Sequence, residues 1–121
     1  MPELDPTTLA SQHCVAVDAT TPPLDHAEVE RLATGLDPAW QVGDDRLVRT
    51  FRFPNFSAAM TLATRISLLA ESQGHHPTLE VAWGRLIVIW TTDAISGLTT
   101  NDLVMAAKVD RLLERGFAIR D

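Results

Sequence analysis

The sequence predicts an α+β fold: a single domain in which a four-stranded, mostly antiparallel sheet carries three helices on one face. Two observations lead to this prediction. The chain has 121 residues, which is enough for one hydrophobic core and short for two. Segments of helical periodicity alternate with pairs of strand-like segments, in the order helix, two strands, helix, two strands, helix. Because the connections are short, neighbouring strands are expected to form antiparallel hairpins.

The first 23 residues differ in composition from the rest of the chain. They hold four of the seven prolines and little hydrophobic periodicity. Residues 1–23 are therefore expected to form an N-terminal arm, and residues 24–121 the folded domain. The one apolar stretch of the arm, Cys14-Val15-Ala16-Val17, has the length and composition of a short edge strand.

The first helix and the first strand pair follow the arm. Asp25 and Glu28 have the spacing of a capping box, so a helix is expected to begin at Asp25. It is expected to end at Gly35, because glycine suits the left-handed position that closes many helices. Two strands are predicted at 40–42 and 46–53, where apolar and polar residues alternate.

The longest periodic segment predicts the second helix. Apolar residues recur at steps of three and four from Phe56 to Ala70. Asn55 is the expected N-cap, and Gly74 the expected end.

A second strand pair and a last helix complete the pattern. Strands are predicted at 78–83 and 85–92, with a turn at Gly84. The run Leu86-Ile87-Val88-Ile89-Trp90 is apolar on both faces, which is typical of a central strand. Thr99, with Asp102 three residues later, is expected to start the last helix.

Bulk composition excludes several classes of function. The net charge is −6, which argues against a basic nucleic-acid-binding surface. Cys14 is the only cysteine, so no intrachain disulfide can form and a reducing compartment is the simpler expectation. The N-terminus lacks the pattern of a secretory signal, and no apolar run approaches the roughly 20 residues of a membrane helix. A soluble, cytoplasmic protein is expected.

The first candidate for a functional site is Gly74-His75-His76-Pro77, between a predicted helix end and a predicted strand. Two adjacent imidazoles offer acid–base groups near neutral pH, although a bare His-His pair is also compatible with two ordinary loop residues. The histidines and Cys14 lack the paired spacing of a zinc site, so no metal is expected. Trp83 and Trp90 are candidates to stack on a flat ligand or to fill the core.

Taken together, these residues resemble the active-site signature of the pterin-4a-carbinolamine dehydratase family. The matching residues run in order along the second half of the chain: Glu71, His75-His76-Pro77, Trp83, Thr92, Gly97-Leu98-Thr99 and Asp102. The resemblance extends from about Leu24 to Leu113. One position departs from it, since Asp93 stands where the family has a third histidine. Ser96 also replaces what is commonly a glycine.

The resemblance implies removal of water from a 4a-hydroxytetrahydropterin, without a metal or a tightly bound cofactor. It assigns the proton chemistry at the ring to His76, and the hold on the 4a-hydroxyl to His75 and the third histidine. Glu71 and Asp102 would orient the site, with Pro77 and Trp83 beside the pterin.

Asp93 alters this expectation. An ionised aspartate accepts hydrogen bonds and donates none, so it would not protonate a leaving hydroxyl unless burial kept it neutral. The substitution predicts a degenerate site with weakened or absent dehydratase activity.

Three functions follow from the resemblance. The first is a non-catalytic assembly or chaperone-type factor, because one bacterial branch with a damaged signature serves as a RuBisCO assembly factor of the α-carboxysome. The second is an active or slow 4a-hydroxytetrahydrobiopterin dehydratase that recycles the pterin cofactor. The third is a pterin-binding protein without turnover. The first is favoured here, with RuBisCO as the protein client and possible carboxysome association.

The expected partners are a second copy of the chain and either a protein client or a pterin. Members of the family form dimers and tetramers, and an open four-stranded sheet leaves edges that can pair with another copy. A homodimer or homotetramer is expected, with no nucleic acid and no membrane as partner.

Overall fold

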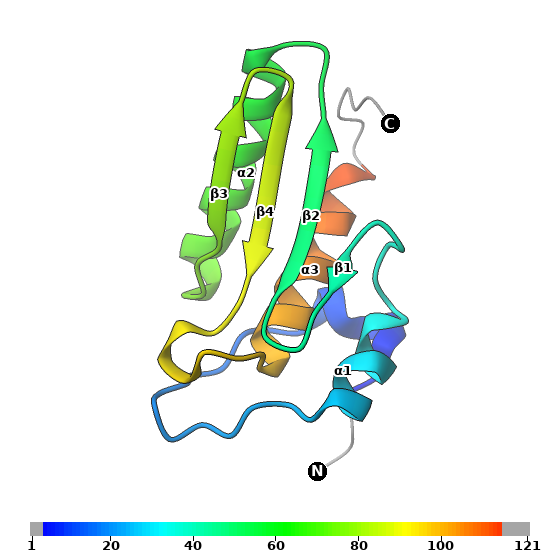
Figure 1. Cartoon of the computed structure of the whole chain (residues 1–121), viewed down its shortest axis with the longest axis vertical. Coiled ribbons are helices and arrows are strands. Elements are labelled where there is room, and N and C mark those ends of the chain that lie inside the picture. Colours follow the sequence, from blue (N-terminus) through cyan, green and yellow to red (C-terminus); the bar gives the residue numbers. More distant parts are fainter. Residues whose placement is uncertain (1–3, 115–121) are drawn as a thin grey trace.

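The computed structural model describes residues 4–114 and confirms the predicted α+β fold (Figure 1). Within this range the elements follow one another in this order: η1 (Pro6–Ser11), α1 (His26–Ala33), β1 (Gln41–Val42), β2 (Leu47–Arg52), α2 (Phe56–Gln73), β3 (Thr78–Ala82), β4 (Arg85–Trp90), η2 (Asp93–Ile95) and α3 (Thr100–Leu113). Residues 115–121, which the sequence assigned to the same domain, lie outside the described residues.

The sheet has four strands in the order β1-β2-β4-β3, and each neighbouring pair is antiparallel. Leu86 of β4 pairs with Phe51 of β2 on one side and with Val81 of β3 on the other, which confirms β4 as a central strand. Helices α2 and α3 lie behind the sheet, on one face (Figure 1). Helix α1 packs against α3 and η1.

The core lies between this face of the sheet and the helices. Leu86, Val88 and Trp90 alternate along β4 and are fully buried, because strand side chains point to opposite faces in turn. Ile87 and Ile89 project from the other face and are half-buried. The sheet therefore has one face packed against helices and one more open face.

The sequence signals that bound the helices are largely confirmed. The Asn55 side chain accepts a hydrogen bond from the Ala58 amide at 2.8 Å, as an N-cap does. Gly74 closes α2 in the left-handed conformation, with φ of 67°. Asp25 caps α1 through the Glu28 amide at 2.8 Å.

The expectation for Gly35 is wrong. Helix α1 ends at Ala33 with Thr34 as a right-handed cap, and Gly35 has no positive φ. A Cβ at Gly35 would lie 1.9 Å from the carbonyl oxygen of Pro6. Glycine is required here because the arm packs directly against the backbone, which helix signals do not reveal.

The arm also differs from its prediction. Residues 14–17 do not form an edge strand; the Cys14 and Val15 amides donate to the side chains of Gln73 and Asn101 instead of to a neighbouring strand. The short helix η1, which no sequence signal predicted, places Leu9 in the core at 1% exposure. Much of the arm is thus packed on the domain.

Within residues 4–114, no helix has both the length and the apolar character that crossing a membrane requires.

Candidate functional site

Two predicted site residues form a buried histidine–aspartate hydrogen bond. Helix α2 ends at the left-handed Gly74, and the chain then turns so that His75 faces the first turn of α3. His75 Nε2 lies 2.6 Å from Asp102 Oδ1, with His75 7% exposed and Asp102 fully buried. The segment between these residues forms the antiparallel strands β3 and β4 and the short η2, which return the chain to the end of the sheet where α2 stops.

The second oxygen of Asp102 is also occupied. Its Oδ2 accepts the Thr92 hydroxyl at 2.7 Å and the Thr99 amide at 3.0 Å. The Thr92 and Thr99 hydroxyls lie 2.9 Å apart. A carboxylate only accepts hydrogen bonds, so His75 Nε2 must carry the hydrogen in this pair. Asp102 therefore selects one tautomer of the neutral His75 ring and leaves its Nδ1 as the acceptor.

Trp90 fixes the plane of the His75 ring. The two rings stack with centroids 5.9 Å apart and an interplanar angle of 11°. Trp90 is fully buried, and its Nε1 has no hydrogen-bond partner among the described residues. The sequence left Trp90 open between ligand stacking and core filling; here it fills the core and also contacts a site histidine.

His76 has a different environment. Its side chain is 59% exposed, and its Nε2 lies 3.3 Å from Oε2 of Glu71, which is 76% exposed. Pro77 follows and is half-buried. The structure thus brings His76 and Glu71 together at the surface, with an imidazole open to solvent or to a ligand.

Asp93 and Trp83 stand apart from these contacts. Asp93 is exposed at the start of η2 and, within residues 4–114, forms no side-chain hydrogen bond with either histidine. Trp83 is 70% exposed at the β3–β4 turn, beyond the whole length of β3 from His76. Five strand residues span about 16 Å, so Trp83 does not meet the histidines within one chain.

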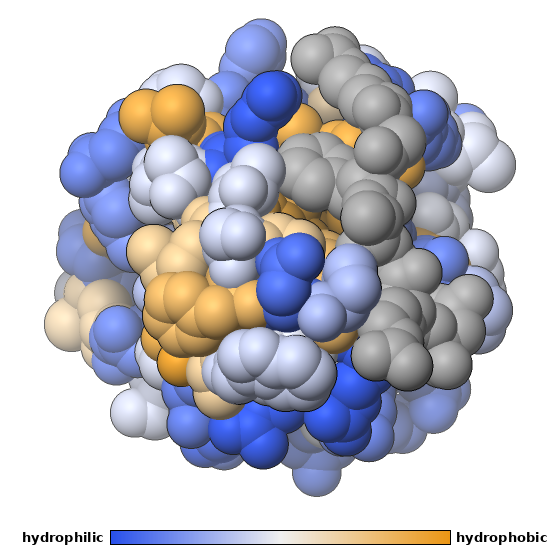
Figure 2. Space-filling model, turned by 90° about the horizontal axis from the view of Figure 1, so that it is seen from above, coloured by the Kyte–Doolittle hydropathy of each residue, from blue (hydrophilic) through white to orange (hydrophobic). Residues whose placement is uncertain are grey.

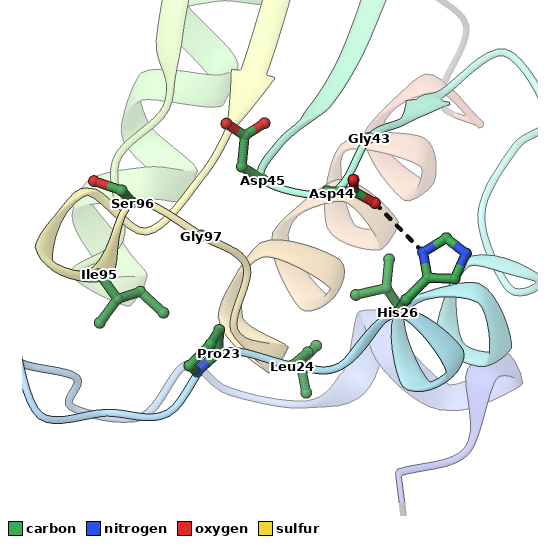
Figure 3. Close-up of a pocket in the computed structure, with 10 residues that line it drawn as sticks. Pro23, Leu24, His26, Gly43, Asp44, Asp45, Ile95, Ser96 and Gly97 are labelled. Carbon is green, nitrogen blue, oxygen red and sulfur yellow. Dashed lines mark ion pairs between the residues drawn. The ribbon is translucent and has the colours of Figure 1, made fainter.

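A pocket of about 780 Å³ is lined in part by Ile95, Ser96 and Gly97, at and just after η2 (Figure 3). Pro23 and Leu24 lie along one side of it and Asp45 along another, while His26 faces Asp44 at 3.4 Å. Its Ile95–Gly97 side belongs to the loop that carries Asp93. The residues predicted to bind pterin do not line this pocket.

The loop between Thr92 and Gly97 links the pocket with the buried pair. Thr92 and Gly97 exchange backbone hydrogen bonds at 2.8 and 3.4 Å, which closes the loop tightly. Ser96 within it has φ of 48°, a left-handed conformation that is unfavourable for a residue with a side chain. This explains why a glycine suits the position.

Outside the pair, burial raises the pKa values of the Cys14 thiol and the Asp110 carboxyl group. Burial raises the pKa of the Cys14 thiol to about 11. Burial also raises the pKa of Asp110, against hydrogen bonds from Asp37, Trp40 and Arg49 that lower it. The Asp110 carboxylate accepts Trp40 Nε1 and Arg49 Nη1, both at 2.8 Å, and so joins α3 to the β-strand region. No cluster of three or more metal-binding side chains occurs in residues 4–114.

Sequence reasoning missed several residues around the pair. Thr92 and Thr99 belong to the signature, but neither was assigned a contact with Asp102; Thr99 was predicted only to start the last helix. Gln73 and Asn101 were not singled out, although each neighbours a site residue and holds the arm. No periodic pattern marks such contacts, because they join a side chain to a distant backbone.

The α+β fold thus carries His75 beside the buried Asp102 and His76 beside the exposed Glu71, which is the arrangement to compare with known proteins. The family model "Pterin 4 alpha carbinolamine dehydratase" matches residues 22–112. The chain belongs to this family.

Curated relatives and one solved structure agree with this assignment. A protein of Chlorobaculum tepidum is 40% identical over 88% of this chain and 99% of its own length. One of Rubrobacter xylanophilus is 48% identical over 86% of this chain and 97% of its own length. Both carry the name "Putative pterin-4-alpha-carbinolamine dehydratase".

The solved structure is a transcriptional coactivator/pterin dehydratase from Brucella melitensis. It superposes with a TM-score of 0.68 at 31% identity, covering 75% of this chain and 98% of that one. The likeness therefore extends to the fold.

Proposed function

We propose that this protein removes water from a 4a-hydroxytetrahydropterin, at a site that His75, His76 and Asp102 form and at a rate that Asp93 limits. The observation that carries the proposal is the His75–Asp102 pair, in which the buried carboxylate has hydrogen-bond donors at both oxygens. Burying a charge without such partners is costly, so a complete network indicates a built arrangement.

The reaction needs one acid and one base. The C4a–O bond breaks, and the hydroxyl receives a proton and leaves as water. The N5–H proton is removed, and its electron pair forms the C4a=N5 double bond of the quinonoid dihydropterin. Proton uptake and release balance, so groups that exchange protons near neutral pH are sufficient.

The two histidines suit different parts of this chemistry. His76 is 59% exposed and can exchange protons with water, which fits the removal of the N5 proton. The Asp102 carboxylate sets the tautomer and orientation of His75, which fits a group that holds the 4a-hydroxyl. Glu71 Oε2 lies 3.3 Å from His76 Nε2 and can accept a hydrogen bond from that ring.

Asp93 lowers the expected rate. The family has an imidazole at this position, which can both donate and accept. An exposed carboxylate accepts only, so the leaving hydroxyl loses one proton donor. The absence of a positioned acid typically lowers a rate roughly 10²–10⁴-fold.

Turnover of chemically prepared 4a-hydroxytetrahydropterin tests the proposal. We expect slow dehydration by the native protein, at least tenfold acceleration by Asp93→His and no acceleration by the charge control Asp93→Asn. His76→Ala should abolish the native rate. Absence of turnover in both the native protein and Asp93→His would contradict the proposal. Pterin binding in that case, measured by calorimetry, would indicate a binding protein without turnover.

A second function is a non-catalytic assembly or chaperone-type factor, such as the RuBisCO assembly factor of the α-carboxysome. The loss of the third histidine favours it, as do exposed apolar side chains along α2. Phe56, Met60 and Leu68 are 47%, 40% and 64% exposed. Seen from the end that carries the start of α2, the surface shows separate apolar patches among hydrophilic residues (Figure 2). Such side chains suit a protein contact.

The same helix face is proposed to hold a second copy of the chain, in a homodimer or homotetramer. Light scattering on the native protein and on Leu68→Lys separates self-association from client binding. We expect Leu68→Lys to reduce the mass of the particle. A native monomer that binds RuBisCO through α2 would support the assembly function instead, and carboxysome association would follow from it.

A further inference from the structure

Three consecutive residues of the arm, His13, Cys14 and Val15, here called the strap, contact the ends of two helices. The Cys14 amide donates to Gln73 Oε1 at 2.9 Å, and His13 Nδ1 lies 3.3 Å from Gln73 Nε2. The Val15 amide donates to Asn101 Oδ1 at 2.9 Å, and Asn101 Nδ2 donates to the Val15 carbonyl at 2.8 Å. The strap thus joins the last residue of α2 to the first turn of α3.

These helix ends are the ones that supply the buried pair. Gln73 precedes His75 by two residues, with only the Gly74 cap between them. Asn101 is the residue immediately before Asp102. Any shift of the α2 end relative to the α3 start changes the 2.6 Å separation of His75 and Asp102.

Asn101 is the firmer of the two attachments. It is 2% exposed, and both polar atoms of its side chain are bonded to the Val15 backbone. If the strap left, both of these hydrogen bonds would be lost, and two polar atoms that are buried now would need other partners. A buried amide that pairs in both directions with a backbone also fixes the register of the strap.

We infer that the strap positions His75 against Asp102, with Gln73 and Asn101 as positioning residues. Thr92, Thr99 and the Trp90 ring hold the pair from the sheet side and the helix start, and the strap holds the two helix ends together. Its effect on turnover rests on the proposed dehydratase function; its effect on the histidine–carboxylate pair does not.

The test compares Asn101→Ala with the matched control Lys108→Met. Lys108 Nζ donates to the Ala10 carbonyl at 2.9 Å, so the control also removes an arm-to-α3 hydrogen bond, but outside the strap. The readout is the His75 Nε2–H resonance in histidine labelled with ¹⁵N, and its rate of exchange with solvent. We expect Asn101→Ala to accelerate exchange at least tenfold and Lys108→Met to change it less than twofold.

Activity provides the second readout. In a native protein that turns over, Asn101→Ala should lower kcat roughly tenfold, because misplacing a reacting group is costly, while Lys108→Met leaves kcat unchanged. If the native protein showed no turnover, the proposed dehydratase function would be wrong. The exchange rates would still test whether the strap positions His75 against Asp102.

Unchanged exchange of the His75 proton in a folded Asn101→Ala protein would overturn the inference. If circular dichroism shows that Asn101→Ala does not fold, Gln73→Met is measured instead. Gln73 is only half-buried, and methionine keeps an aliphatic side chain of similar length, so this variant is expected to fold. For Gln73→Met we expect at least threefold faster exchange, and exchange at the native rate would equally overturn the inference.

Discussion

His75 and His76 are neighbours in the chain but occupy opposite environments. His75 is 7% exposed, stacked on Trp90 and 2.6 Å from a fully buried carboxylate. His76 is 59% exposed and reaches a carboxylate that is itself 76% exposed, at 3.3 Å. The contrast indicates a division of labour, in which one ring is held in a set orientation and its neighbour is free to exchange protons.

The two histidine–carboxylate pairs must also differ in energy. Exposed pairs typically contribute 0–1 kcal/mol to stability, because water and salt screen them. Leaving a buried donor or acceptor without its partner typically costs about 1–3 kcal/mol, and more where the group is charged. Substitutions of equal size in the two pairs should therefore have unequal effects.

Asp102→Asn should produce the largest effect. The amide keeps the size of the side chain but loses the charge and one acceptor, in a place where three groups donate. We expect the free energy of unfolding in urea to fall by about 2–4 kcal/mol. Glu71→Gln, the equivalent change in the exposed pair, should cost less than about 0.5 kcal/mol. Equal losses of unfolding free energy in Asp102→Asn and Glu71→Gln would show that the buried and the exposed pair contribute equally to stability.

Cys14 of the strap lies beside the buried histidine–aspartate pair in the fold, since its amide donates to Gln73 at the end of α2. Burial raises the pKa of Cys14 from 9.0 to about 11. Since the thiolate is the reactive form, alkylation by iodoacetamide at pH 8 should be about 100-fold slower than for a free thiol. Asn101→Ala should restore much of the alkylation rate, because it releases the strap. If Cys14 of the native protein reacted as fast as a free thiol, the thiol would be accessible and the prediction would be wrong.

The same pKa gives stability a pH dependence. Because the folded protein holds the Cys14 proton more tightly than the unfolded chain, the associated stability is complete below pH 9. It is lost as the pH rises from about 9 to about 11. Thermal unfolding of the native protein and Cys14→Ser across this range should therefore diverge, with the native protein losing more stability.

Replacing each histidine by alanine separates structure from chemistry. His75→Ala removes a donor to Asp102 and should lower the free energy of unfolding by about 1–3 kcal/mol, together with activity. His76→Ala should change stability by less than about 0.5 kcal/mol while lowering dehydratase activity. Urea unfolding and turnover on the same preparations measure both effects. A stable but inactive His75→Ala protein would contradict the division of labour.

The smallest effect concerns the loop that carries Asp93. Ser96 adopts φ of 48°, and glycine tolerates this conformation without a steric penalty. We expect Ser96→Gly to raise the free energy of unfolding by about 0.5 kcal/mol, because the greater entropy of glycine in the unfolded chain offsets part of the gain. Calorimetric melting against Ser96→Ala, which keeps the strain, measures the difference.

Local signals in the sequence were sufficient for the fold. Asn55 and Gly74 bound α2 as predicted, and the doubly apolar run from 86 to 90 became the central strand, because caps and periodicity depend on near neighbours. The reason for Gly35 and the path of the arm were not predictable in this way. They depend on Pro6 and Asn101, which meet their partners only after the chain has folded.

The candidate site was also predictable only in part. The signature includes both His75 and Asp102, and in the structure His75 Nε2 lies 2.6 Å from Asp102 Oδ1. It also included Trp83, which the β3–β4 turn carries to the far end of the sheet. A motif records which residues accompany one another in a family, and it does not say which of them touch within one chain.

The stack of Trp90 on His75 has an optical consequence. A protonated imidazole quenches the emission of an indole in contact with it, whereas a neutral imidazole quenches far less. Trp90 is fully buried, while Trp83 is 70% exposed and emits at longer wavelength. Trp40 is also buried, so in a Trp40→Phe protein the short-wavelength part of the intrinsic fluorescence comes from Trp90 and reports its contact with the His75 ring.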